Sequence, residues 1–123
     1  SAATLAICQR LVRLICPHCK EPHVPPEAVL AAWGLQDADR SGFHRGRGCR
    51  SCLSTGYKGR TGVYEILPID ETIQDMIVQR KSAHEIRRDA LARGVLRPLK
   101  ADAARKAALG LTTLEEAATA VMG

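Results

Sequence analysis

Large aromatic side chains are scarce in this sequence, which has one Trp, two Tyr and one Phe among 123 residues. Aromatic residues supply much of the buried area of an ordinary core, so a chain of this size gains considerably from a metal that ties it together. Long apolar runs are also missing. None approaches the roughly 20 residues that a membrane-spanning helix requires. We therefore expect a small domain, or a fragment of a larger protein, without a membrane span.

Motifs that carry catalysis are missing as well. Neither a Ser-His-Asp arrangement nor an inward-facing pair of carboxylates can be argued from the order of residues. Gly56, Gly59 and Gly62 are spaced by three, but the lysine and serine of a Walker-type phosphate loop do not accompany them. We expect this chain by itself not to be an enzyme, with no catalytic residue.

Cysteines, in contrast, occur in a regular pattern. Cys16 and Cys19 form one Cys-x-x-Cys pair, Cys49 and Cys52 form another, and 29 residues separate the pairs. In such a turn both thiolates can face the same side, and two facing turns provide the tetrahedral sulfur shell that Zn²⁺ accepts. Four protein ligands leave no open position for water or substrate. The spacing therefore predicts a structural zinc site that closes residues 20–48 into a loop.

Disulfides and redox catalysis are the other uses of paired cysteines. Disulfides belong to oxidising compartments, whereas a basic, helix-rich sequence without a recognisable secretory signal is typical of an intracellular protein. A redox pair of the Cys-Pro-His-Cys type at residues 16–19 needs a helix that opens at its first cysteine. Pro22, Pro25 and Pro26 follow too closely for that helix, and the second pair goes unexplained. Cys8 lacks a partner at such a spacing, which indicates a buried small hydrophobe.

Positive charge is concentrated in the first half of the chain. The net charge is +5, and residues 1–60 hold nine Lys and Arg against four Asp and Glu, while the remainder holds nine of each. Six cations and no carboxylate lie between residues 40 and 60: Arg40, Arg45, Arg47, Arg50, Lys58 and Arg60. Two interpretations remain open. The cations offset the thiolates of a zinc loop, or they bind an acidic protein, an anionic lipid or a nucleic acid.

Local patterns predict an α+β chain that is mainly helical. Residues 2–8 are helix-prone, residues 9–15 alternate as a strand that leads into the first cysteine pair, and prolines open a helix over residues 27–33. Residues 63–67 form a second strand ended by Pro68, which pairs with the first strand.

Four helices are predicted after the second strand. Asp70 caps the first, over residues 70–79, with Ile73, Met76 and Ile77 on its buried face. The second begins with a capping box at residues 82–85 and ends at Gly94. The third covers residues 99–109, and a fourth follows to residue 122, capped by Thr112 with Glu115 or by Thr113 with Glu116.

Five motifs in this order resemble one protein family over nearly the whole chain. They are Gln-Arg-Leu-Val-Arg at 9–13, Cys-Pro-His-Cys-Lys at 16–20, Gly-Cys-x-x-Cys at 48–52, Thr-Gly-Tyr-Lys-Gly-Arg-Thr-Gly-Val-Tyr-Glu at 55–65 and Gly-Leu-Thr-Thr-Leu-Glu-Glu at 110–116. Together they resemble the C-terminal portion of the type II secretion and type IV pilus assembly ATPases, in the subgroup with four cysteines.

The resemblance implies a division of the chain into four parts. Residues 1–15 would end a RecA-like ATPase core with a helix and a strand, residues 16–60 would form the zinc-binding subdomain, residues 61–69 would return as a core strand, and residues 70–123 would form a helical subdomain. In the family the Walker motifs and the aspartate and histidine boxes precede this portion. ATP and Mg²⁺ would thus bind only to the parent protein.

The resemblance also implies a setting and partners. We expect a cytoplasmic homo-hexamer, peripheral to the inner membrane, that contacts the inner-membrane platform protein of the secretion or pilus machine and not nucleic acid. The alternative, from another class of protein, is a free-standing zinc module. It would bind nucleic acid through the cations of residues 40–60, with Phe43 or Tyr57 stacking on bases.

Overall fold

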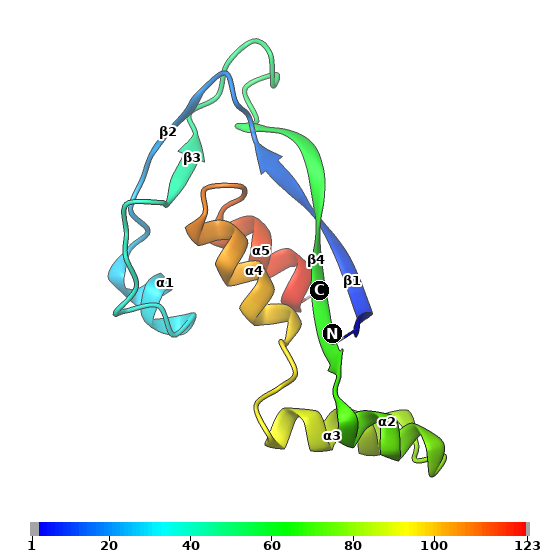
Figure 1. The fold of residues 1–123 in the computed structure, drawn as a ribbon. Coiled ribbons are helices and arrows are strands. Elements are labelled where there is room, and N and C mark those ends of the chain that lie inside the picture. Colours follow the sequence, from blue (N-terminus) through cyan, green and yellow to red (C-terminus); the bar gives the residue numbers. More distant parts are fainter. Residues whose placement is uncertain (1–2, 123) are drawn as a thin grey trace.

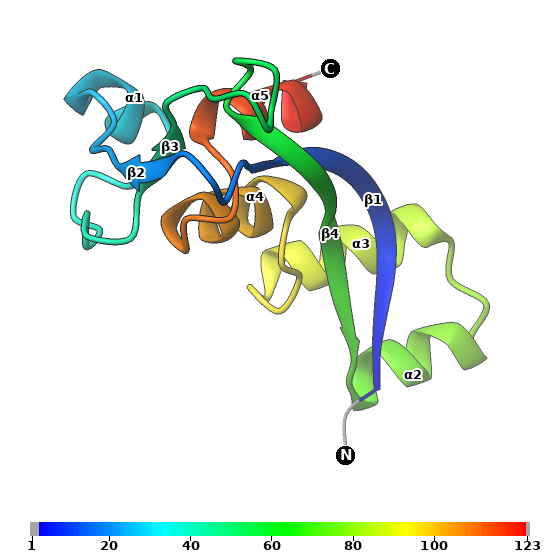
Figure 2. The same cartoon turned by 90° about the horizontal axis from the view of Figure 1, so that it is seen from above.

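A long antiparallel hairpin is the central element of the fold. The computed structural model describes residues 3–122, and in it β1 (Ala3–Ile15) pairs with β4 (Tyr57–Ile69) along their whole lengths (Figure 1). The register runs from Ala3 opposite Ile69 to Ile15 opposite Tyr57, with irregularities near Ile7 and Leu14 that bend and twist the ribbon (Figure 2). The pairing of the two predicted strands is confirmed.

The prediction of a helix at residues 2–8 is wrong over its described part, residues 3–8, which belong to β1; Ala2 lies outside the described residues. Leu5 lies opposite Leu67 and Ala6 opposite Ile66, so cross-strand pairs outweigh a weak local preference for helix. The second strand is also longer than predicted. It begins at Tyr57 and continues through Pro68, which a two-stranded ribbon tolerates because each strand has one open edge.

A small arm lies between the two long strands. It contains the antiparallel pair β2 (Lys20–Pro22) and β3 (His44–Gly46), with α1 (Glu27–Ala32) in the connection. The helix is close to the one predicted from the prolines. The short strands were not predicted, because three residues give no readable alternation. Gly46 is required in this arm, since a Cβ there would come within 2.0 Å of the carbonyl oxygen of Gly56.

Four further helices follow β4, and their caps agree with the sequence. They are α2 (Glu71–Val78), α3 (Ala83–Ala92), α4 (Leu99–Ala108) and α5 (Leu114–Met122). The side chains of Asp70, Ser82 and Thr113 accept the expected N-terminal hydrogen bonds of α2, α3 and α5. Within residues 3–122 no helix is long and apolar enough to cross a membrane.

The helices pack against opposite ends of the hairpin (Figures 1 and 2). Near the arm, alanines of α4 and α5 pack on Val12 and Val63, and their small size lets both helices approach the strands closely. At the other end, α2 and α3 bury a separate cluster of Leu67, Ile73, Ala90 and Leu96. Five helices and two two-stranded sheets over residues 3–122 confirm the α+β class.

Candidate metal centre

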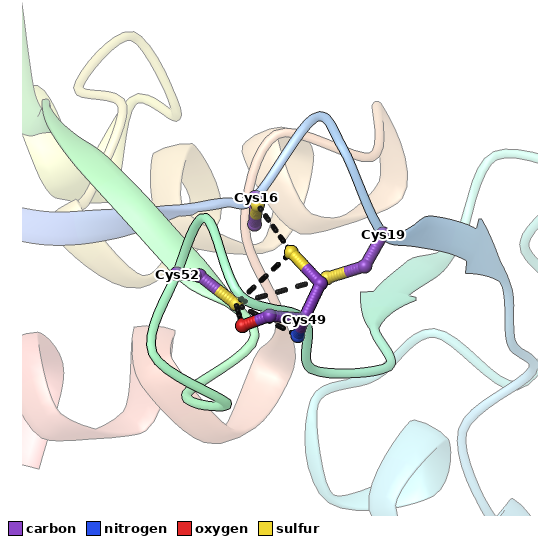
Figure 3. Close-up of side chains that lie close together, drawn as sticks. All are labelled: Cys16, Cys19, Cys49 and Cys52. Carbon is purple, nitrogen blue, oxygen red and sulfur yellow. Dashed lines mark hydrogen bonds between the residues drawn. The ribbon is translucent and has the colours of Figure 1, made fainter.

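Four cysteine sulfurs meet where the long strands lead into the arm (Figure 3). Cys16 directly follows β1, and Cys19 directly precedes β2. Cys49 and Cys52 lie on the turn between β3 and β4. All four ligand atoms lie within 4.8 Å of one another, and three of the four residues are buried. The structure therefore brings together the complete set of predicted zinc ligands.

Three of the six distances between the sulfurs match a four-coordinate metal, and the other three are at most 4.8 Å. The Sγ atoms of Cys16 and Cys49 are 3.8 Å apart, those of Cys19 and Cys52 are 3.9 Å apart, and those of Cys49 and Cys52 are 3.7 Å apart. A tetrahedron with metal–sulfur bonds of about 2.3 Å places its sulfurs about 3.8 Å apart. A disulfide requires about 2.05 Å, and all of these cysteines are free. The donor set and its spacing fit a closed tetrathiolate site.

Backbone N–H groups point at two of the sulfurs. Gly48 N–H donates to Cys19 Sγ at 3.2 Å, and the N–H groups of Cys49 and Gly56 donate to Cys52 Sγ at 3.3 and 3.2 Å. The turn reaches this geometry through left-handed backbone at Leu53. Such bonds stabilise thiolates and fix the orientation of metal ligands.

The pKa values of two buried thiols are shifted in opposite directions. Burial raises the pKa of Cys19 to about 11, although the N–H of Gly48 acts against it. Burial also tends to raise the pKa of Cys52, but N–H groups of Cys49 and Gly56 outweigh this effect and lower the pKa to about 6. Of these two thiols Cys52 is the more acidic, and a metal that binds all four sulfurs must displace a proton from Cys19.

An ion pair ties α5 to the strand that enters the centre. The carboxylate of Glu116 accepts hydrogen bonds from the backbone N–H and the guanidinium of Arg13 at 2.8 and 2.9 Å. Burial tends to raise the pKa of Glu116, but the bonds from Arg13 outweigh it and the pKa lies below its usual range. The same guanidinium lies 4.2 Å from the ring centroid of Tyr57, whose hydroxyl bonds Thr113 at 2.6 Å. Thr112, the other predicted cap residue, instead donates to the carbonyl of Arg13.

A buried ion pair ties α4 to β4. Asp102 is 2% exposed and accepts hydrogen bonds from Lys106 at 2.9 Å, Tyr64 N–H at 2.8 Å and Arg105 at 3.1 Å. Burial tends to raise the pKa of Asp102, but these donors outweigh it and lower the pKa. Neither pair was predicted, because helical spacing shows which face is buried and does not show which distant strand meets it.

The six predicted partner-binding cations do not form one uniform group. Arg40 pairs with Glu27, and Arg45 pairs with Glu21 at 3.2 Å, so both hold the arm together. Over residues 3–122, ion pairs are absent for the other four: Arg47, Arg50, Lys58 and Arg60. The amine of Lys58 instead bonds the hydroxyl of Ser51 at 2.7 Å.

The hairpin, its tetracysteine knuckle (residues 16–19 and 47–58) and the helices packed on both ends define a small α+β module with a candidate metal centre. Residues 1–119 match the family described as Type II/IV secretion system protein, and the chain belongs to that family. The resemblance seen in the sequence is thus confirmed.

Curated relatives agree with this family. The chain is 41% identical over 110 residues to the type II secretion system protein E of Pseudomonas aeruginosa, covering 89% of this chain and 22% of that protein. It is 43% identical over 119 residues to the type IV pilus assembly ATPase PilB of Thermus thermophilus, covering 94% of this chain and 13% of that protein. It is 36% identical over 117 residues to the type II secretion system protein E of Aeromonas hydrophila, covering 94% of this chain and 23% of that protein. The chain thus spans less than a quarter of the length of these relatives.

Proposed function

We propose that this chain is the zinc-binding and helical C-terminal part of a hexameric motor ATPase that drives type II secretion or type IV pilus assembly. The family match and relatives named as secretion proteins and a pilus ATPase support this proposal. ATP, Mg²⁺ and hydrolysis belong to the remainder of the parent protein, because the sequence here holds no Walker motif. The motor would be cytoplasmic and peripheral to the inner membrane.

The role that we propose for zinc is mechanical. The observation that carries it is the sulfur tetrahedron of Cys16, Cys19, Cys49 and Cys52, which leaves no position for a substrate or a reactive water. Thiolates are soft ligands, and a tetrahedral set of four favours zinc or iron. Zinc bound there would stabilise the end of the hairpin and the arm, with no redox step of its own.

The hairpin is well placed to join this arm to a motor core. Leu5 and Leu11 of β1 are exposed, and within residues 3–122 each long strand has another strand as its neighbour on one edge only. The other edge of β4 forms a single bridge between Ile66 and Arg97, and side chains of α4 and α5 bond part of both outer edges near the cysteines. Open edges with exposed apolar side chains are normally covered by further strands or helices. We propose that the remainder of the parent chain covers them, so that β1 and β4 complete a RecA-like core sheet. The rigid arm would then transmit motion of the core to a neighbouring subunit or to the platform protein.

The test is Cys49→Ser in the complete motor protein, with Cys8→Ser as the control. Cys8 lies on β1, outside the sulfur cluster. We expect Cys49→Ser to lose bound zinc and to stop secretion or pilus assembly, because three thiolates cannot close the site. Cys8→Ser should retain both. A Cys49→Ser motor that keeps its fold and still secretes would contradict the proposal.

Metal content gives an independent check on the isolated chain. Elemental analysis should find one zinc per chain, with one reactive thiol before chelation and all five after it. Iron instead of zinc would refute the metal assignment.

A nucleic-acid-binding zinc module, the other candidate, would require DNA or RNA affinity that falls steeply with salt. A gel shift at low salt that shows no complex would remove it.

A further inference from the structure

The knuckle carries positive charge that the chain itself does not neutralise. Of the 18 Lys and Arg residues, nine form ion pairs within residues 3–122. Six of the other nine lie within eight positions of a metal ligand: Arg10, Lys20, Arg47, Arg50, Lys58 and Arg60. Four thiolates and one Zn²⁺ carry a net charge of −2. Those six cations exceed this charge by four, so neutralising the metal site does not account for all of them.

An exposed leucine projects from the same turn. Leu53 directly follows Cys52, and its side chain is 84% exposed. Its φ is 56° and that of Ser54 is 64°, in the left-handed region that residues other than Gly, Asn and Asp seldom adopt. Hydrogen bonds of the knuckle hold this backbone, with Ser54 N–H donating to the carbonyl of Cys49 at 2.8 Å. The metal centre thus fixes an apolar side chain in contact with water.

Three of the unpaired cations lie on this turn or at the start of β4, directly after it. Arg50 lies between two ligands, Lys58 reaches back to Ser51, and the N–H of Arg47 donates to the carbonyl of Cys19 at 3.1 Å. The loop between β3 and β4 forms the end of the molecule opposite to α2 and α3 (Figure 1). An exposed apolar side chain and cations on one segment, whose backbone is held by hydrogen bonds before binding, suit a docking surface.

We propose that residues 47–58 dock on an acidic protein surface, with Leu53 in an apolar pocket and carboxylates facing Arg47, Arg50 and Lys58. The inference rests on the proposed function, in which the arm meets another component of the machine, and it names the contact surface and the chemistry of the partner. Docking through complementary charge should weaken at high salt.

The described part of a second copy does not fit as the partner. Eight of the 13 carboxylates of this chain already form ion pairs. The other five are divided among the loop after α1, helix α2 and the start of α5: Asp37, Asp39, Glu71, Asp75 and Glu115. A lipid surface fits less well than a protein, because Leu53 is the one large exposed apolar side chain on residues 47–58.

Photo-crosslinking in cells that assemble the machine tests the proposal. The complete motor protein carries p-benzoylphenylalanine in place of Leu53, and the crosslinked peptide is sequenced. We expect one protein segment rich in Asp and Glu. Arg50→Glu should lower the crosslink at least tenfold, and Glu→Arg in the captured segment should restore it. The same photoreactive group in place of Val78, which is 80% exposed on α2, should not capture that segment.

Several outcomes would overturn the proposal. Capture of a phospholipid or of nucleic acid would assign the surface to another partner, and a crosslink unchanged by Arg50→Glu and by Lys58→Glu would remove the role of charge. Loss of zinc from both charge variants would show that the cations serve the metal site. If Cys49→Ser stops secretion while Leu53→Asp leaves secretion intact and Arg50→Glu leaves both secretion and capture intact, the proposed function stands and the docking surface is refuted.

Discussion

Replacing Lys106 by Met should destabilise the zinc-loaded protein by about 3 kcal/mol. Its amine bonds the carboxylate of Asp102 at 2.9 Å and also donates to the carbonyl of Gly62, so one side chain joins α4 to β4. Removing one partner of a buried ion pair typically costs about 3–5 kcal/mol, because the other charge stays buried. Arg105 at 3.1 Å and Tyr64 N–H at 2.8 Å still contact Asp102 in the variant. We therefore expect the lower end of that range.

The assay is urea unfolding of the zinc-loaded chain followed by circular dichroism. Lys100→Met is the matched control, because Lys100 is exposed on the same helix. Its amine makes one long hydrogen bond, to the carbonyl of Ala32 at 3.3 Å, and lies 5.6 Å from the ring centroid of Trp33. We expect the control to change stability by at most about 1 kcal/mol.

A double-mutant cycle isolates the interaction between the two charges. Asp102→Asn alone should also destabilise, since Lys106 would then be a buried cation without its anionic partner. The double variant Asp102→Asn with Lys106→Met should be more stable than the sum of the single changes predicts, by about 1–2 kcal/mol. The reasoning would be refuted if Lys106→Met were no more destabilising than Lys100→Met, or if the two changes were additive.

Three further predictions concern acid, a glycine and the metal. Because the pKa of Asp102 is lowered in the folded state, its ion pair stabilises the fold above about pH 4, and this stabilisation is lost as the pH falls through the lowered pKa. In urea titrations the stability difference between wild type and Asp102→Asn should therefore shrink below about pH 4. A constant difference would contradict this. Gly46→Ala should lower the stability by about 2 kcal/mol and weaken zinc binding, because the new Cβ meets the backbone of Gly56. Gly94 has open space around it and a φ of 71°, so Gly94→Ala should lower the stability by about 1 kcal/mol. In a chelator competition Gly94→Ala should leave zinc affinity unchanged. Chelation should remove hydrogen-exchange protection from the N–H groups of Gly48 and Gly56 and spare the cluster around Ile73; equal loss everywhere would show that zinc holds the whole fold.

The clustering of the four cysteines could be predicted from the sequence because the pattern of each pair is local. Each Cys-x-x-Cys pair occupies one turn, and only the meeting of two turns depends on the fold. Helix ends were predictable for a similar reason, since Asp70, Ser82 and Thr113 bond N–H groups within three residues of themselves. These features require no knowledge of distant neighbours.

Contacts between distant residues were not predictable in the same way. Arg13 and Glu116 are separated by 103 positions, and the capping pattern around Glu116 accounted for the glutamate without the ion pair. Residues 3–8 have the small and apolar composition of many helices, and their pairing with β4, more than 50 positions away, makes them a strand. The exposed position of Leu53 follows from left-handed backbone at Leu53 and Ser54, which these residue types do not indicate in the sequence.

The long hairpin gives a reason why zinc bound at one end would matter to the whole module. A two-stranded ribbon is marginal in water on its own, and 13 residues of strand at about 3.3 Å each extend roughly 40 Å. Packing by α4 and α5 stabilises the half near the cysteines, and Glu116 holds Arg13 three positions before the first metal ligand, Cys16. Movement of the knuckle would therefore strain both β1 and α5 together. A partner that binds the knuckle would act on the helices through this ion pair. Glu116→Gln should therefore uncouple α5 from the knuckle without removing zinc. Hydrogen exchange of α5 measures the loss of coupling, and metal analysis checks that zinc is retained.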